Sequence, residues 1–313
     1  MSPNTSPTLY AGLDIAKANL QFHLAGQFHD LPNTPAGHRR LRQLLAAVPG
    51  SHVVCEATGG YERDVVAALH QAAVPVSVLN PARGRHFARA QGQRAKTDRI
   101  DAAVLTACGL ALQPPPTPAR SELEQQLAEL VRRRAQLLAA LVAQRQQAQH
   151  LTVAALCRQA RGLVRRLEHD LAQLEELLAQ LRAQSEALNQ RVQRLASIAG
   201  VGPTTALGVL AELPELGTLN RGQAAALAGL APHPRESGAW QGRRTTGGGR
   251  AAVRRALYMA ALSAARCNRH LRSFYQRLRQ AGKPAKVALA AVMRKLIVLM
   301  NHALKNPHFS LAT

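Results

Sequence analysis

Lys96-Thr97-Asp98-Arg99-Ile100-Asp101-Ala102 is the stretch around which the chain is organised. Thr97 is suited to cap a helix, and the apolar run at 102–107 continues that helix. Because Asp98 and Asp101 are three residues apart, both carboxylates leave one face of its first turn. One interpretation is that they only offset the positive end of the helix dipole, which stabilises a helix by about 0.3–1 kcal/mol for each acid. A surface ion-pair cluster with the neighbouring Lys and Arg is a second interpretation, and a metal site is a third.

Two more acids stand alone in strand-like sequence upstream. Asp14 lies in the apolar run at 10–17, and Glu56 ends a β-branched run that begins at Ser51. A carboxylate in an apolar run is costly unless it is paired, protonated or bound to metal, although an Asx turn at a strand end also explains Asp14. Glu56 falls at the carboxyl end of a strand, where open α/β sheets place their sites. Four carboxylates from separate elements are hard oxygen ligands that suit Mg²⁺.

The first 112 residues are predicted to form an α/β domain. Their order, β-β-β-α-β-α-β-α with the Asp98 helix closing it, matches a ribonuclease-H-like sheet, in which acids of the first strand, a later strand end and a helix converge. The expected elements are two strands joined by a tight turn within 10–24, a strand near 27–31, helices at 37–48 and 61–72, strands at 51–56 and 75–80, and a helix from Pro81.

A proline-rich linker at 113–118 precedes two leucine-patterned segments, and these predict two long helices. They would pack as an antiparallel hairpin or as a coiled coil between subunits, and a plain spacer is the simplest alternative. The first pattern is Leu123, Leu127, Leu130, Leu137 and Leu141, and the second, after Gly162, is Leu167, Leu171, Leu174, Leu178, Leu181, Leu188, Val192 and Leu195. We therefore expect a catalytic domain at 8–112, a coiled-coil helical hairpin at 119–194 and a C-terminal domain at 195–313.

The C-terminal domain is predicted to be helical and to begin with a glycine turn. Gly200 and Gly202 lie in a hydrophobic-Gly-hydrophobic-Gly turn that opens a helix and resembles the hairpin of helix-hairpin-helix DNA binders, which presents backbone N–H groups to a phosphate. A polar, glycine-rich, basic loop is expected at 232–250. Ser237 lies in this loop, and without a His or Lys at fixed spacing it is only a phosphate-contact candidate. Further helical patterns cover 223–230, 250–267, 271–280 and 285–304.

The charge of the chain indicates a polyanionic partner. The 313 residues include 40 Lys plus Arg against 18 Asp plus Glu, a net charge of +22. The segment 232–313 holds 16 of these basic residues and the single acid Glu236, which is +15 of the +22. Because the chain has only ten aromatic residues, contacts to phosphate are a better expectation than base stacking.

No feature of the sequence indicates a membrane protein or a secreted one. The cysteines Cys55, Cys108, Cys157 and Cys267 are scattered and lack metal-ligand spacing, so we expect small buried residues in a reducing compartment. The first residues lack the pattern of a signal peptide, and Arg294 and Lys295 interrupt the apolar stretch at 287–304. The expectation is a cytoplasmic protein without membrane contact.

Taken together, the motifs resemble those of DEDD-type insertion-sequence transposases, in the family's order from about residue 10 to 306. One departure is the triple glycine at 247–249, where a single glycine is more typical. The motifs that resemble the acidic domain are Leu13-Asp14-Ile15-Ala16-Lys17, Glu56-Ala-Thr-Gly-Gly-Tyr61 and the 96–102 stretch; those that resemble the C-terminal transposase domain are Ile198-Ala-Gly-Val-Gly-Pro203, Leu227-Ala-Gly-Leu-Ala-Pro232, Arg235-Glu-Ser237-Gly238 and Arg254-Arg-Ala-Leu-Tyr258-Met-Ala-Ala261.

The resemblance implies a RuvC-like domain in which Asp14, Glu56, Asp98 and Asp101 bind two Mg²⁺ ions. It also implies that Ser237 is the nucleophile that becomes linked to a DNA phosphate. Donor and target DNA, a bridge RNA that guides the enzyme, and dimers or tetramers in which the serine of one subunit completes the acidic site of another are implied as partners. The expected nucleic-acid contacts are Lys96, Gly200, Gly202, Arg235, Arg243, Arg244, Arg250, Arg254 and Arg255.

Two other functions compete with this interpretation. A RuvC-like nuclease would use the four acids with water as the nucleophile and leave Ser237 idle. A non-enzymatic architectural protein would need only the coiled coil and the basic C-terminal segment. The large basic domain argues against the first alternative, and the four acids in metal-site contexts argue against the second.

Overall fold

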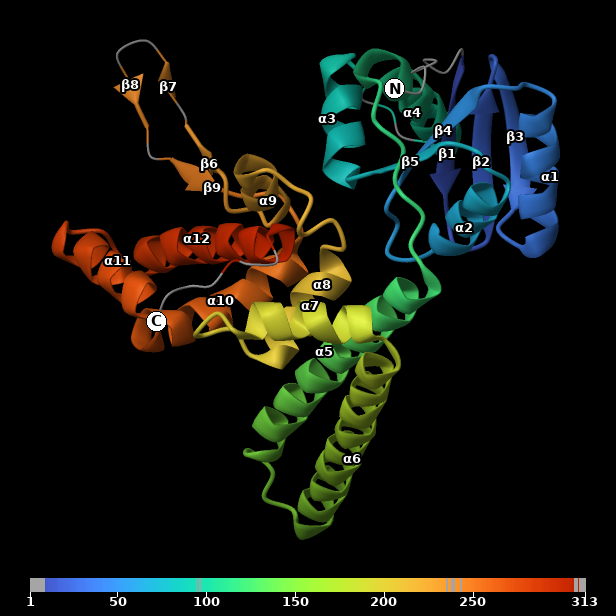
Figure 1. Cartoon of the computed structure of the whole chain (residues 1–313). Coiled ribbons are helices and arrows are strands. Elements are labelled where there is room, and N and C mark those ends of the chain that lie inside the picture. Colours follow the sequence, from blue (N-terminus) through green and yellow to red (C-terminus); the bar gives the residue numbers. More distant parts are fainter. Residues whose placement is uncertain are drawn as a thin grey trace. The chain divides into compact units, whose positions relative to one another are not determined.

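The computed structural model describes residues 9–93, 95, 97–234, 236–237, 240–242, 244–306 and 309 (Figure 1). The chain divides into two compact units, Met1–Ala119 and Arg120–Thr313.

The first unit contains a mixed five-stranded sheet with the strand order β3-β2-β1-β4-β5. β1, β2 and β3 are neighbours in antiparallel pairs, whereas β1, β4 and β5 are parallel. The carboxyl ends of β1, β3, β4 and β5 therefore share one edge of the sheet. This confirms the predicted order of elements and is compatible with a ribonuclease-H-like fold. The strands are β1 (Leu9–Ile15), β2 (Asn19–Leu24), β3 (Gln27–Pro32), β4 (Ser51–Glu56) and β5 (Val76–Leu79).

Side-chain alternation along the strands buries both faces of this sheet. Leu13 and Phe22 point to the face covered by α1 (Pro35–Ala46) and α2 (Arg63–Gln71). Tyr10 and Val54 point to the opposite face and pack with side chains of α4 (Asp98–Leu112). The shorter α3 (Pro81–Ala90) contacts α4 on the same face. The acids of β1 and β4 must therefore be assigned to one of these two faces.

The second unit begins with two long helices, α5 (Glu122–Ala148) and α6 (Ala154–Gln184). They pack side by side and run antiparallel, because Arg134 pairs with Glu175 and Arg145 pairs with Glu168. The prediction of one helix from 167 to 195 is wrong. Ser185 ends α6, and its hydroxyl accepts a hydrogen bond from the Leu188 N–H, which starts α7 (Glu186–Ala196). Gly162 lies inside α6 rather than before it.

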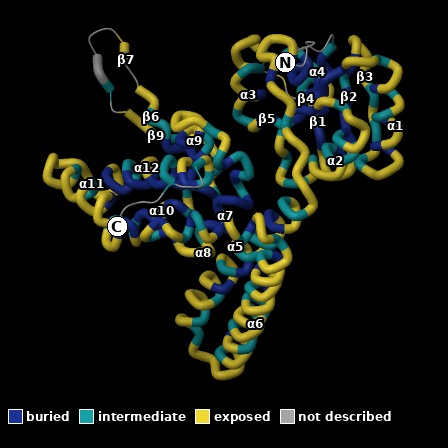
Figure 2. Tube along the Cα trace, in the orientation of Figure 1, coloured by how far each residue is buried: buried dark blue, intermediate teal, exposed yellow. Residues whose placement is uncertain are grey.

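The remaining helices of the second unit enclose one apolar core. α12 has the length and composition of a membrane span, but half of its most apolar window is buried in the unit, as in the core helix of a globular protein. Figure 2 shows buried residues along one side of α10 and α12, whereas α6 is largely exposed. The helices are α8 (Pro203–Glu212), α9 (Arg221–Leu227), α10 (Ala251–Cys267), α11 (Arg269–Gln280) and α12 (Ala285–Lys305).

The segment expected to be a loop at 232–250 contains four short strands. β6 (Pro232–His233) pairs with β9 (Thr245–Thr246), and β7 (Glu236–Ser237) pairs with β8 (Trp240–Gln241), so the chain doubles back as a β-hairpin. All four cysteines are free thiols. The prediction that they are buried is confirmed for Cys55 and Cys108 and is wrong for the exposed Cys267.

Candidate functional site

Four polar residues form a row across the sheet of the first unit. Asp14 of β1 is paired with Gln21 of β2, and Gln21 is paired in turn with Asp30 of β3. On the other side of β1, Leu13 is paired with Cys55, so Glu56 is the next position of β4 alongside Asp14. Neighbouring positions on paired strands point to the same face, so these four side chains share one face of the sheet.

This face is the one that α4 covers. A Cβ on Gly12 would collide with the Ala102 carbonyl oxygen, and a Cβ on Gly109 would meet Tyr10. Later residues of α4 therefore lie against earlier residues of β1, and the first turn of α4 points toward Asp14. Gly12 is two residues before Asp14 and shares its face. The sheet row and the first turn of α4 thus lie at the same end of the same face.

The first turn of α4 carries the other two predicted acids. Thr97 caps the helix as predicted, accepting a hydrogen bond from the Ile100 N–H at 3.3 Å. Asp98 is exposed and Asp101 is partly buried. Arg99, between them, pairs with Asp30 of the sheet row at 3.6 Å, which ties this turn to β3.

The Glu56 carboxylate packs closely against α3. A Cβ on Gly84 would collide with Glu56 Oε1, so this close approach requires a glycine. Burial raises the pKa of Cys108 on α4, the positive charge of Arg83 lowers it, and the negative charge of Glu56 raises it further. Glu56 therefore packs against α3 and lies near enough to Cys108 of α4 for its charge to affect that thiol.

The donor set fits a hard divalent cation, although the side chains do not yet surround one. Asp14, Glu56 and Asp101 are partly buried carboxylates, and α3 leaves space for Glu56 only because residue 84 has no side chain. In the described part of the chain, no three His, Cys, Asp or Glu side chains form a group that could hold a metal ion. The topology thus gathers the four predicted acids at one end of one face, while their closure around an ion would need side-chain movement.

Asn33, which the sequence reasoning missed, joins the two turns that follow the strand acids. Its Nδ2 donates to the carbonyl oxygens of Ala16 at 3.0 Å and Tyr61 at 3.2 Å. Its Oδ1 lies 2.8 Å from Nε2 of the buried His38, which therefore acts as the donor. Burial lowers the pKa of His38. Asn33 directly follows β3, and only the sheet order reveals that this end of β3 lies beside the other two turns.

Glu62 organises the glycine turn after Glu56 in the same way. Its Oε2 accepts hydrogen bonds from the N–H groups of Thr58 at 3.0 Å and Gly60 at 2.8 Å, and from the Thr58 hydroxyl at 3.2 Å. Burial raises the pKa of Glu62, but these hydrogen bonds outweigh burial and hold the pKa below its usual range. Glu62 is thus a structural anion of the turn rather than a free ligand.

The second unit carries Ser237 on the hairpin. Ser237 is exposed and is paired with Trp240 across the β7–β8 ladder. The neighbouring Arg235 and Gly238 lie outside the described residues, as does Arg243. An exposed serine on a short hairpin is accessible to a large substrate.

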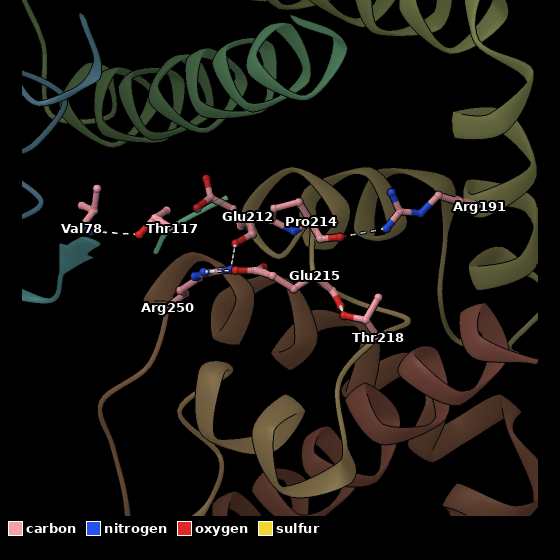
Figure 3. Close-up of polar contacts among 8 residues, drawn as sticks. All are labelled: Val78, Thr117, Arg191, Glu212, Pro214, Glu215, Thr218 and Arg250. Atoms are coloured by element: carbon pink, nitrogen blue, oxygen red, sulfur yellow. Dashed lines mark hydrogen bonds and ion pairs between the residues drawn. The ribbon is translucent and has the colours of Figure 1, made fainter. Parts of the chain in front are cut away.

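Arg250 anchors the base of this hairpin (Figure 3). Its guanidinium donates to both Glu215 carboxylate oxygens, at 2.6 and 2.7 Å, and to the Glu212 carbonyl oxygen at 2.8 Å. Burial raises the pKa of Glu215, and the Arg250 ion pair and hydrogen bonds outweigh this and lower it. Arg191 donates to the carbonyl oxygens of Pro214 and Leu216, so the segment that receives Arg250 is itself held in place.

The triple glycine has a structural explanation at two of its three positions. Gly248 and Gly249 have φ of +66° and +60°. A Cβ on Gly249 would collide with the backbone of Gly229, so the hairpin base and the end of α9 meet backbone to backbone. Arg254 donates to the Gly248 carbonyl oxygen at 2.7 Å. Gly247 has open space around it and an ordinary φ, so only this third glycine lacks a steric reason.

Two family models match the chain. One, described as "Transposase" for DEDD enzymes of IS110 type, matches residues 11–157, and the other, "Transposase IS116/IS110/IS902 family", matches residues 192–276. The pilin gene-inverting proteins of Moraxella bovis and Moraxella lacunata are each 28% identical over 303 residues, covering 93% of this chain and 94% of the relative.

The chain belongs to the IS110-type DEDD transposases. Its class of activity is therefore DNA transposition and recombination, with DNA as the substrate, and the family generally uses divalent metal ions.

Within this transposase, the predicted nucleic-acid contacts fall into three groups. Arg244 and Arg255 are exposed, and Arg250 and Arg254 are partly buried and bond to protein groups at the hairpin base. Lys96, like Arg235 and Arg243, lies outside the described residues.

The two glycines of the turn before α8 have different surroundings. Gly200 has φ of +100° and packs against the backbone of Ala264 on α10, so its lack of a side chain is needed for packing. Gly202 caps α8 and has open space around it. Of the two, only Gly202 has space around it, and its contact with a phosphate stays a prediction.

Proposed function

We propose that this transposase cuts and rejoins DNA strands through a covalent phosphoserine intermediate. Asp14, Glu56, Asp98 and Asp101 hold two Mg²⁺ ions, and Ser237 is the nucleophile. The single observation that carries the proposal is the position of Asp14 and Glu56, side by side on the face and at the end of the sheet to which the first turn of α4 points. Four carboxylates in this arrangement have no use in a protein that only binds DNA.

The metal ions, when bound, lower the pKa of a coordinated hydroxyl and stabilise negative charge on phosphate oxygens. The chain's own residues supply the support for them. Gly84 leaves room for the Glu56 carboxylate, Glu62 holds the turn behind it, and Asn33 holds that turn to the one after Asp14. Without this support the two strand acids would share a sheet but not a fixed separation.

The chemical step is a transesterification at a DNA phosphate. The Ser237 Oγ forms a bond to phosphorus, the bond from phosphorus to one bridging oxygen breaks, and the departing DNA hydroxyl takes up a proton in exchange for the one serine loses. The phosphodiester energy is retained in the serine linkage, so a second DNA hydroxyl can reverse the step without ATP. The names of the two relatives support rejoining, because inverting a gene requires that cut strands be sealed again.

The proposal extends to partners and assembly. The segments 8–112, 119–194 and 195–313 act as the RuvC-like catalytic domain, the coiled-coil hairpin and the C-terminal transposase domain, in a dimer or tetramer where Ser237 of one subunit completes the acidic site of another. A bridge RNA pairs with donor and target DNA, which leaves the protein to hold phosphates. The absence of any acid between 237 and 313 supports this role for the last segment.

The test compares Ser237→Ala with Asp14→Asn on labelled DNA carrying an element end. Wild type is expected to leave protein covalently attached to a DNA strand on a denaturing gel, and peptide mapping should find the phosphate on Ser237. Ser237→Ala should bind DNA and Mg²⁺ normally but form no adduct, and Asp14→Asn should form no adduct because it loses a ligand charge. Near-normal cutting by Ser237→Ala without an adduct would instead indicate a water-dependent nuclease.

A further inference from the structure

Gln21 is the one member of the sheet row that is neither an acid nor part of the proposed metal site. It lies on β2 between Asp14 and Asp30, which are its paired neighbours on the two adjacent strands. Cβ atoms of directly paired residues are roughly 4.5–5.5 Å apart, so a glutamine side chain reaches either neighbour. The amide thus stands directly beside a proposed metal ligand.

The Gln21 amide is buried without an acceptor. The residue is 6% exposed, and in the described part of the chain Nε2 is the one buried side-chain nitrogen or oxygen for which no hydrogen-bond partner is found. Burying an unpaired amide is unfavourable, so proteins keep few of them, and those few call for an explanation. At this position a leucine or methionine would pack with less cost.

The surrounding contacts fix where this amide points. Leu20 and Phe22 pack on the α1–α2 face, so Gln21 must point to the α4 face. His23, the next residue of β2 on that face, bonds to the Thr106 hydroxyl of α4 at 2.8 Å, which holds β2 against α4. Gln21 therefore cannot turn away to solvent.

Of its two acidic neighbours, Asp14 is the better acceptor. The Asp30 carboxylate is two-thirds exposed and is already paired with Arg99. Asp14 is partly buried, and a carboxylate with four lone-pair sites can accept a further hydrogen bond beside its other interactions. Carboxylates that bind metals are usually oriented by such a second hydrogen bond.

We propose that Gln21 is a positioning residue: when a divalent ion binds, its Nε2 donates to Asp14 and fixes which carboxylate oxygen faces the ion. This inference rests on the proposed metal site. It assigns to β2 a role that neither the acids nor the family motifs indicated, because a glutamine between two apolar residues reads as an ordinary strand position.

The first test measures metal binding by the full chain without DNA. Gln21→Met keeps the length of the side chain and removes the donor. Calorimetric titration with Mn²⁺ is expected to show about a 10- to 100-fold weaker affinity than wild type. In EDTA the same variant should melt at or above the wild-type temperature, by up to about 4 °C, because an unpaired buried amide is gone. Gln27→Met, at an exposed position of the same sheet, is the matched control and should change neither quantity.

The second test does not depend on the Gln21→Met variant. In wild type labelled with ¹⁵N-glutamine, the Gln21 amide protons should shift downfield when Mg²⁺ is added, and Asp14→Asn should abolish the shift. Wild-type Mn²⁺ affinity in Gln21→Met, or an amide signal that ignores Mg²⁺ while the wild type binds it, overturns the role of Gln21 alone. A wild type that binds no divalent ion overturns this role and the proposed metal site together.

Discussion

The four acids and Ser237 are supported by very different structures. The strand acids stand on paired strands of a five-stranded sheet, beneath a helix that fits only because Gly12 has no side chain. Ser237 stands on a two-residue strand paired with another two-residue strand. The base of its hairpin is anchored through Arg250, Arg254 and Gly249. We therefore expect the fold to fix the backbone positions of the acids, and the orientation of Ser237 to depend on what binds it.

Gly12→Ala should disturb the packing of α4 on the sheet that carries the acids, and we expect it to have the largest effect on stability. The new methyl group meets the Ala102 carbonyl, so α4 must shift on β1, and we expect the first unit to lose about 3 kcal/mol of unfolding free energy. Urea unfolding followed by hydrogen exchange in β1 measures the loss. The matched control is Gly162→Ala within α6, which has open space and should gain roughly 0.5–1 kcal/mol. Equal effects at the two glycines would show that α4 does not rest on Gly12.

Arg250→Gln should loosen the base of the serine hairpin. Both partners of the ion pair are about one-third exposed, so we expect a cost of only about 1 kcal/mol to the second unit, from the unpaired Glu215 carboxylate. Hydrogen exchange should accelerate at the amide of residue 250, which donates to the Leu227 carbonyl. The control is Arg255→Gln, which changes an exposed arginine of α10 and should leave that amide protected. No acceleration in Arg250→Gln would mean that Arg254 and the glycine contact anchor the hairpin without Arg250.

Acid should weaken each unit through one carboxylate. The pKa values of Glu62 and Glu215 are lowered in the folded chain. Their contribution to stability is therefore present above the ordinary value of 4.5 and is lost as the pH falls through the lowered value. Calorimetric unfolding between pH 6 and pH 3 measures the melting temperature of each unit. Its pH dependence should be smaller for the first unit in Glu62→Gln and smaller for the second unit in Glu215→Gln. A variant with unchanged slopes would show that its carboxylate has no lowered pKa.

Gly247→Ala should have the smallest effect, a change within about 0.5 kcal/mol, because the position has open space and an ordinary φ. Gly249→Ala, two residues away, is the control and should be clearly destabilising, since its new methyl group collides with the Gly229 backbone. Thermal unfolding of both variants measures the difference. Comparable losses would mean that the whole triple glycine is constrained.

The sequence predicted the framework of the first unit better than its finer contacts. Strands and the Thr97 cap follow from local patterns, because alternation and capping act over a few residues. Gln21 and Asn33 gave no local signal. Their meaning depends on the register of β2 with β1 and on the end of β3 lying beside two other turns, and both are set by pairing across the sheet.

In the second unit, three predictions from the sequence were wrong or incomplete, and each has a local cause. The leucine spacing continues through 185, so periodicity alone could not reveal that Ser185 caps a new helix. The hairpin at 232–250 lacks the long alternation that predicts strands, because its paired strands are two residues each. Arg250 was predicted to hold DNA, and nothing in the sequence indicates that Glu215 occupies its guanidinium.

The crossing of α4 over β1 also orders events during synthesis. Asp14 and Glu56 leave the ribosome first, but the face that carries them stays uncovered until residues 98–112 emerge and pack on Gly12. Domains generally fold as units from the N-terminus during translation. The first unit, whose residues all precede Arg120, can therefore complete its acidic face before Ser237 has been made. A growing chain at that stage already carries the proposed metal ligands but not the proposed nucleophile, Ser237.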